Sequence, residues 1–62
     1  MLDGRWEEAA AELEKVVAME PGMGLGYLQL GNVYRKLGRE AEARKALRRA
    51  SQLYQAKKED LP

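Results

Sequence analysis

The sequence contains no cysteine and no histidine, and these two absences exclude much of the usual chemistry of small domains. Without cysteine, neither a disulfide nor a thiolate metal site is available to stabilise a chain of 62 residues. Without histidine, the commonest transition-metal ligand and the commonest general base are missing. Ser51 is the only serine or threonine, and no histidine is present to activate it. We therefore expect no catalytic residue, no metal, no cofactor and no enzymatic activity.

Long apolar stretches are also absent, so neither a secretory signal nor a membrane span is predicted. The first residues, Met1 to Arg5, do not form a basic segment followed by an apolar run. No apolar stretch approaches the roughly 20 residues that cross a bilayer. Glu8 and Glu12 lie one helical turn apart but lack the shaped loop that calcium requires, so they are expected to be solvated. A cytoplasmic location without a membrane partner is expected.

Charge is nearly balanced overall but unevenly distributed along the chain. Residues 1–20 carry six acidic and two basic side chains, whereas residues 35–62 carry nine basic and four acidic ones. This asymmetry indicates a charged partner, or one copy of the chain docking on another. The basic run 44–49 lacks the interleaved aromatic residues that base stacking requires, which argues against nucleic acid. A solvated outer face and a contact with the acidic first helix of another copy both remain open for this run.

Apolar residues recur at spacings of three and four in three segments, and each segment is predicted to be a helix. The first spans 5–20 and ends where Pro21 begins a glycine-rich turn. The second ends at Gly38, a residue suited to the left-handed conformation that closes a helix. The third contains no proline and is expected to continue past Leu53 towards Lys58. No segment alternates apolar and polar residues as a strand would, so the predicted fold class is all-α.

The sequence repeats itself at an offset of 34 residues. At this offset the first predicted helix falls on the third, and Leu13 falls on Leu47. The second and third helices contain the motif Tyr27, Leu30, Gly31, Tyr34, Gly38, Ala43, Leu47 and Ala50. The motif and the period both resemble the tetratricopeptide repeat. The resemblance implies antiparallel helix-turn-helix repeats of an α–α superhelix. Residues 5–20 would be the second helix of one repeat, and residues 24–57 one complete repeat.

Proteins of the tetratricopeptide family hold extended or helical peptides in a concave groove lined by the first helix of each repeat. The resemblance therefore implies a protein-interaction scaffold whose partner is a protein or a peptide. Carried over position by position, the groove residues are Leu25, Leu28, Asn32, Arg35 and Lys36. Asn32 is suited to hydrogen-bonding a peptide main chain or a carboxylate, while Arg35 and Lys36 favour an acidic ligand. Leu28 stands where carboxylate-clamp members of the family have lysine, which argues against a full clamp.

Repeats of this kind normally need three or more stacked units, and this sequence supplies about one and a half. The chain is either a piece of a longer array or associates so that copies complete each other's missing helix. The apolar stripe of the first helix is expected to lie open, and it predicts self-association through Trp6, Leu13 and Val17. The alternative function is therefore a structural self-assembly module that forms a homo-oligomer. A regulatory part of an enzyme encoded outside this sequence is a third hypothesis.

Overall fold

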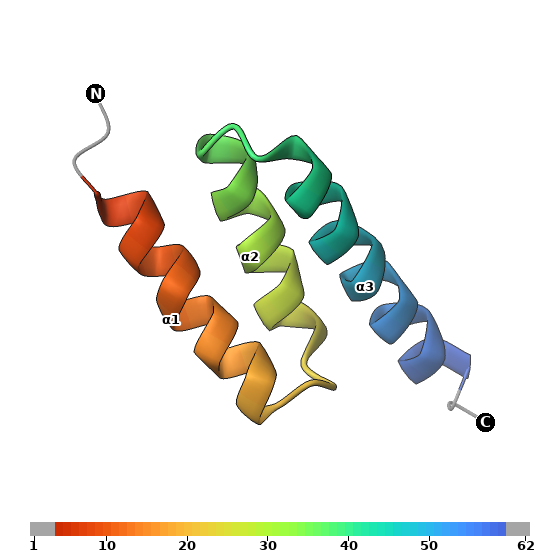
Figure 1. Ribbon diagram of the computed structural model, residues 1–62. Coiled ribbons are helices and arrows are strands. Elements are labelled where there is room, and N and C mark those ends of the chain that lie inside the picture. The colour runs from red at the N-terminus through yellow and green to blue at the C-terminus, as the bar shows by residue number, and fades with distance from the viewer. Residues whose placement is uncertain (1–3, 60–62) are drawn as a thin grey trace.

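The computed structural model describes residues 4–59, with side chains up to residue 56. It contains three helices: α1 (Arg5–Met19), α2 (Gly24–Lys36) and α3 (Glu40–Glu59). Residues 4–59 include no strand, so the predicted all-α class is confirmed. Figure 1 shows α2 between α1 and α3, with neighbouring helices running antiparallel.

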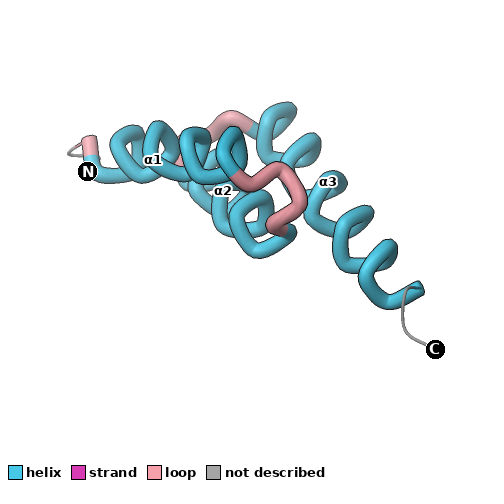
Figure 2. Tube along the Cα trace, turned by 90° about the horizontal axis from the view of Figure 1, so that it is seen from below, coloured by secondary structure: helices cyan, strands magenta, loops and turns pink. Residues whose placement is uncertain are grey.

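α2 is the central helix of this arrangement. It contacts α1 and α3, whereas α1 and α3 do not contact each other within the described residues. Seen from below, α2 lies to one side of α1 (Figure 2). One side of α2 is therefore left uncovered by either neighbour.

The end of α2 is fixed by Gly38, as the sequence predicts. Gly38 has a φ of 81°, in the left-handed region that favours glycine. Its N–H donates to the Arg35 carbonyl at 3.1 Å, and the Arg39 N–H donates to the Tyr34 carbonyl at 2.9 Å. This pair of bonds is the Schellman pattern, which satisfies carbonyls that the helix end would otherwise leave unpaired.

The other predicted helix ends also agree with the structure. α1 ends at Met19, and its acidic first turn, with Glu7 and Glu8, complements the helix dipole. α3 continues to Glu59, well past Leu53, as expected for a helix without proline. The division of the chain into the end of one repeat and a complete second repeat stays a prediction.

The core is built from small and medium apolar side chains between α2 and its two neighbours. Its buried members are Ala10, Val17, Leu30, Val33, Tyr34, Ala43 and Ala46. α2 and α3 approach closely at Gly31, where an added Cβ would lie 2.6 Å from the Leu47 side chain. The absence of a side chain at Gly31 therefore sets the distance between these two helices.

Candidate functional site

The uncovered side of α2 carries all five residues that the sequence predicts for a groove. Their spacing brings them to one face of the helix, the outer face of α2, which consists of Leu25, Leu28, Asn32, Arg35 and Lys36. Leu25 is 51% exposed, and Leu28 is half-buried. Arg35 and Lys36 are exposed near the C-terminal end of the helix. The outer face therefore runs from an apolar end to a basic end.

These five residues do not line a single hollow. Asn32, Arg35 and Lys36 line one of about 390 Å³ at the basic end. Leu28 lines another, of about 480 Å³, together with side chains of α3. The α3 residues in this apolar hollow are Leu47, Ala50, Ser51, Tyr54 and Gln55.

A third hollow, lined by residues of α2 and α3, shares one lining residue with each of the first two. It has a volume of about 290 Å³ and is lined by Arg35, Glu40, Ala43, Arg44 and Leu47. Arg35 also lines the basic hollow, and Leu47 also lines the apolar one. The three hollows are therefore neighbours, and together they are called the α2–α3 groove, which has a basic end and an apolar end.

The α3 side of this groove was not predicted from the sequence. The sequence feature that could have indicated it is the absence of proline after Leu53. Without a proline α3 continues, and its next residue, Tyr54, lies beside the start of α2. A Cβ added to Gly24 would lie 3.3 Å from the Tyr54 ring, so the ring lies close to the α2 backbone. Tyr54 is nevertheless 46% exposed, which leaves part of its ring free to contact a ligand.

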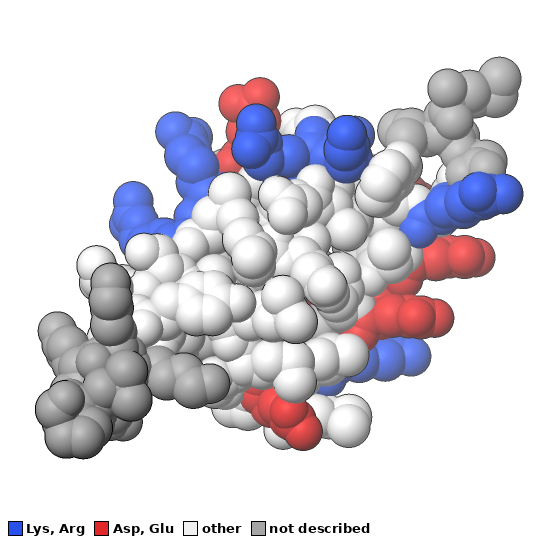
Figure 3. Space-filling view, turned by 180° about the vertical axis from the view of Figure 1, so that it is seen from behind, with Lys and Arg blue, Asp and Glu red and all other residues white. Residues whose placement is uncertain are grey.

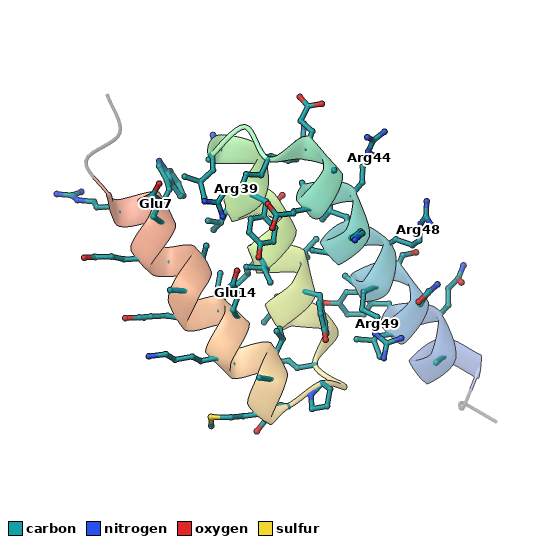
Figure 4. All side chains as sticks on the ribbon, in the orientation of Figure 1. Glu7, Glu14, Arg39, Arg44, Arg48 and Arg49 are labelled. Atoms are coloured by element: carbon teal, nitrogen blue, oxygen red, sulfur yellow. The ribbon has the colours of Figure 1, made fainter. Side chains whose placement is uncertain are left out.

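Charged side chains divide between the two edges of the molecule on the side of the outer face. Figure 3 shows uncharged side chains across the middle of this side, both acidic and basic ones along the α1 edge, and mainly basic ones along the α3 edge. Figure 4 shows Arg44 and Arg48 projecting from α3. Asp3 and Asp60, which contribute to the predicted charge asymmetry, lie outside the described residues. The outer face of α2 thus lies between α1, with four glutamates and two basic residues, and α3, with four basic residues and two glutamates up to residue 56.

The apolar stripe predicted for self-association is largely covered by α2. Val17 is buried, and a Cβ added to Gly26 would lie 3.0 Å from its Cγ1 atom. Leu13 is half-buried against the core, and Trp6 is 38% exposed. The stripe does not lie open as expected, because these side chains find their partner helix within the same chain. Self-association through Trp6, Leu13 and Val17 stays a prediction, and it requires α1 to exchange between copies.

Lys36 belongs to the outer face but also reaches towards α1. Its Nζ lies 6.0 Å from the centroid of the Trp6 ring, at the outer limit of a cation–π contact. Arg35, by comparison, lines two of the three hollows of the groove. Arg35 is therefore the better placed cation for a ligand in the groove.

Tyr34 joins α2 to α1 on the side opposite the outer face. It lies two residues after Asn32 and hence on the other side of the helix. Its hydroxyl donates a hydrogen bond to the Glu14 carboxylate. Burial raises the pKa of Tyr34 from 10.0 to about 12, and the bond to Glu14 and the charge of that carboxylate add to the rise. This contact stabilises the packing of α1 on α2.

The raised pKa of Tyr34 predicts a loss of stability in alkali. Below pH 10 the phenol is neutral in the folded and unfolded chains, and its full contribution to stability is present. Between pH 10 and about 12 the unfolded chain loses this proton first, so the free energy of unfolding falls, by up to about 3 kcal/mol. Urea titrations of wild type and Tyr34→Phe measure this, because the variant lacks the titrating group. If wild type and Tyr34→Phe differed in free energy of unfolding by the same amount at every pH in this range, the prediction would be contradicted.

The described residues contain neither a membrane-spanning helix nor a cluster suited to a metal ion. No helix within residues 4–59 is both long and apolar enough to cross a membrane. Nor do these residues bring together three or more histidine, cysteine or acidic side chains that could hold a metal. Glu8 and Glu12 are exposed on α1, as expected for solvated carboxylates.

Three antiparallel helices with a close glycine contact between the last two are the arrangement that the 34-residue repeat implies. A family model described as tetratricopeptide repeat matches residues 1–59. The chain belongs to the tetratricopeptide repeat family. No curated protein and no solved structure matches it. Tetratricopeptide repeats are generally protein-interaction scaffolds and typically not catalytic, so a protein partner is indicated for this one.

Proposed function

We propose that this tetratricopeptide chain holds a segment of another polypeptide on the outer face of α2 and in the α2–α3 groove. The observation that carries the proposal is the row of three neighbouring hollows, from Arg35 at the basic end of the groove to Leu28 and Tyr54 at its apolar end. A ligand lying along it contacts cations and an apolar surface at once. Convergent polar and apolar groups of this kind are typical of a recognition surface.

The chemistry of the groove favours an acidic segment that carries at least one apolar side chain. Arg35 presents a planar guanidinium that is suited to binding a carboxylate. The Asn32 side chain offers both a donor and an acceptor for main-chain groups. Leu28 and Tyr54 supply the apolar contact. Because Leu28 occupies the position of the clamp lysine, a full carboxylate clamp is not part of this proposal.

Selection of a phage-displayed random peptide library on the immobilised chain tests the proposal. We expect the selected peptides to be enriched in Asp and Glu. Arg35→Ala is expected to weaken the binding of a selected peptide at least tenfold, which is about 1.4 kcal/mol, because a charge-assisted hydrogen bond is lost. The matched control is Lys45→Ala, which removes a charge from a different side of α3, beside Tyr34, and should leave the Kd unchanged. Peptides without acidic enrichment that bind both variants as tightly as wild type would contradict the proposal.

A second candidate function is the assembly of copies into an oligomer. The observation that favours it is the difference in net charge, because acidic residues outnumber basic ones on α1 and basic residues outnumber acidic ones on α3 up to residue 56. Opposite charges on two edges of one molecule favour head-to-tail contact between copies. The two functions are separable, because Arg35→Ala weakens ligand binding in the first and leaves the mass of the assembly unchanged in the second.

A further inference from the structure

α1 and α3 are equivalent elements at the 34-residue offset, which gives residues 6–19 of α1 their counterparts at residues 40–53 of α3. Two pairs of counterparts differ in opposite ways. Ala10 of α1 is buried in the core at 3% exposure, whereas its counterpart Arg44 is exposed. Ala46 of α3 is buried at 6% exposure, whereas its counterpart Glu12 is exposed. At both positions, the helix that packs its side chain into the core has alanine, and the other helix has an exposed charged residue. This charged residue is Glu12 on α1 and Arg44 on α3.

On α1 the charged position belongs to an exposed edge with a definite order along the helix. The acidic edge consists of Glu8, Glu12, Val16 and Met19, which lie at spacings of three and four on one side of α1. Its first half carries the two glutamates and its second half the two apolar residues, and exposed Lys15 lies on the same side of α1 between Glu12 and Met19. Met19 is 80% exposed and Val16 is 36% exposed, so both apolar side chains are accessible in this chain.

On α3 an edge of opposite charge has the same order. The basic edge consists of Arg44, Leu47, Arg48 and Tyr54. Its first half carries two exposed arginines that project from the helix (Figure 4). Its second half carries Tyr54, beside the apolar hollow of about 480 Å³ that Leu28 also lines. Charge comes first and apolar surface second on both edges.

We infer that a second copy of this chain docks its acidic edge on the basic edge, with the two helices parallel. This inference rests on the second candidate function and names its surfaces. Charge complementarity selects the partner: α1 carries four glutamates and two basic residues, and α3 up to residue 56 carries four basic residues and two glutamates. A partner helix that presented only apolar side chains would leave Arg44 and Arg48 without carboxylates to pair with.

The spacing of charged and apolar residues agrees between the two edges. Along the acidic edge, Glu12 follows Glu8 by four residues, and Met19 follows Glu12 by seven. Along the basic edge, Arg48 follows Arg44 by four residues, and Tyr54 follows Arg48 by six. At a rise of about 1.5 Å per residue, the two spans differ by only about one residue's length. A parallel alignment sets carboxylates beside guanidinium groups and Met19 beside Tyr54 and its hollow, whereas an antiparallel one loses both matches.

The contact is head-to-tail, because the two edges lie on different helices of the same molecule. Each added copy leaves one edge of each kind free, so association continues beyond a dimer unless a ring closes. Exposed ion pairs each contribute little, so the association is weak and depends on salt. This predicts a solution behaviour different from that of a closed, salt-resistant dimer.

Equilibrium sedimentation of the whole chain at concentrations up to about 1 mM measures contacts as weak as about −4 kcal/mol. The wild-type mass is expected to rise above that of the monomer with concentration. It is expected to fall back as salt is raised from about 0.1 M to 1 M, where the Debye length shrinks from about 10 Å to about 3 Å. Met19→Ser, at a side chain already 80% exposed, should weaken the association without changing the helical circular dichroism.

Charge reversal identifies the surfaces. The double variants Glu8→Lys with Glu12→Lys, and Arg44→Glu with Arg48→Glu, are each expected to weaken self-association at least tenfold, because like charges then face each other. An equimolar mixture of the two is expected to associate again, since each negative edge meets a positive one, and an unfolded variant would give no such recovery. The matched control replaces Lys45 and Arg49 with glutamate, the same change of charge on another side of α3, and should associate as wild type does.

A wild-type chain that stays monomeric at every concentration in low salt would overturn both the inference and the second candidate function, and would leave the ligand groove untouched. Wild-type association that both charge-reversed variants retain would overturn the inference alone. Loss of association in both variants without recovery on mixing would also overturn it. Recovery on mixing, with an unaffected control, is the result that supports it.

Discussion

Leu30→Ala is expected to destabilise the chain by about 2–5 kcal/mol, because it removes a large side chain from the core. Leu30 is 5% exposed and lies between α2 and its neighbours, so its removal leaves a cavity that rigid helices fill poorly. A chain of 62 residues is expected to have a free energy of unfolding of about 3–9 kcal/mol. Urea unfolding followed by circular dichroism should therefore show most of the stability lost, and some of the chain unfolded without denaturant.

The matched control for this change is Leu25→Ala. It removes the same atoms from the same helix, but Leu25 is 51% exposed on the outer face. We expect a change within about 0.5 kcal/mol, as for other surface substitutions. Equal destabilisation by the two variants would contradict the position of the core, because it would mean that both faces of α2 are covered.

Gly31→Val is expected to destabilise the chain by about 3 kcal/mol, at the upper end of the range for overpacking. An added Cβ would lie 2.6 Å from both Cγ and Cδ2 of Leu47 and 3.3 Å from the Ala43 carbonyl oxygen. The Leu47 side chain has some freedom to move, but the Ala43 carbonyl is backbone, so α2 and α3 must separate. The small gain in helix propensity over glycine offsets less than about 1 kcal/mol of this cost.

Gly22→Val serves as the control for this second prediction. Gly22 has no atom within 4 Å of an added Cβ and lies outside the left-handed region. The change in the free energy of unfolding is expected to stay within about 0.5 kcal/mol, measured in the same urea titration. If Gly31→Val were as stable as this control, the close approach of α2 and α3 would be wrong, and with it the shape of the groove that they form.

The helix boundaries were predictable because local residues determine them. Pro21 cannot continue α1, and Gly38 supplies the left-handed residue that closes α2. Neither effect depends on the rest of the fold. The residues of the outer face of α2 were instead taken from the resemblance to the tetratricopeptide family, and the helical period of 3.6 residues adds only that Leu25, Asn32 and Lys36 share one side.

The α3 side of the groove was not predictable because it depends on distances between helices. Tyr54 lines the groove only because α3 runs close beside the start of α2, where Gly24 leaves room for its ring. The covering of the α1 stripe has a similar cause. Gly26 has no side chain, so Val17 packs directly against the α2 backbone and is buried within the chain. Spacing along one helix carries no information about such contacts.

A nuclear magnetic resonance titration of the 15N-labelled chain with a selected acidic peptide tests the proposed ligand surface most directly. We predict shifts in the amide signals of the outer face of α2, together with those of Leu47 and Tyr54 across the groove. The signal of Glu14 should stay unchanged, because its side chain bonds Tyr34 on the opposite side of α2. Shifts confined to α1, with the α2 and Tyr54 signals unmoved, would contradict the proposal that this chain holds its partner in the α2–α3 groove.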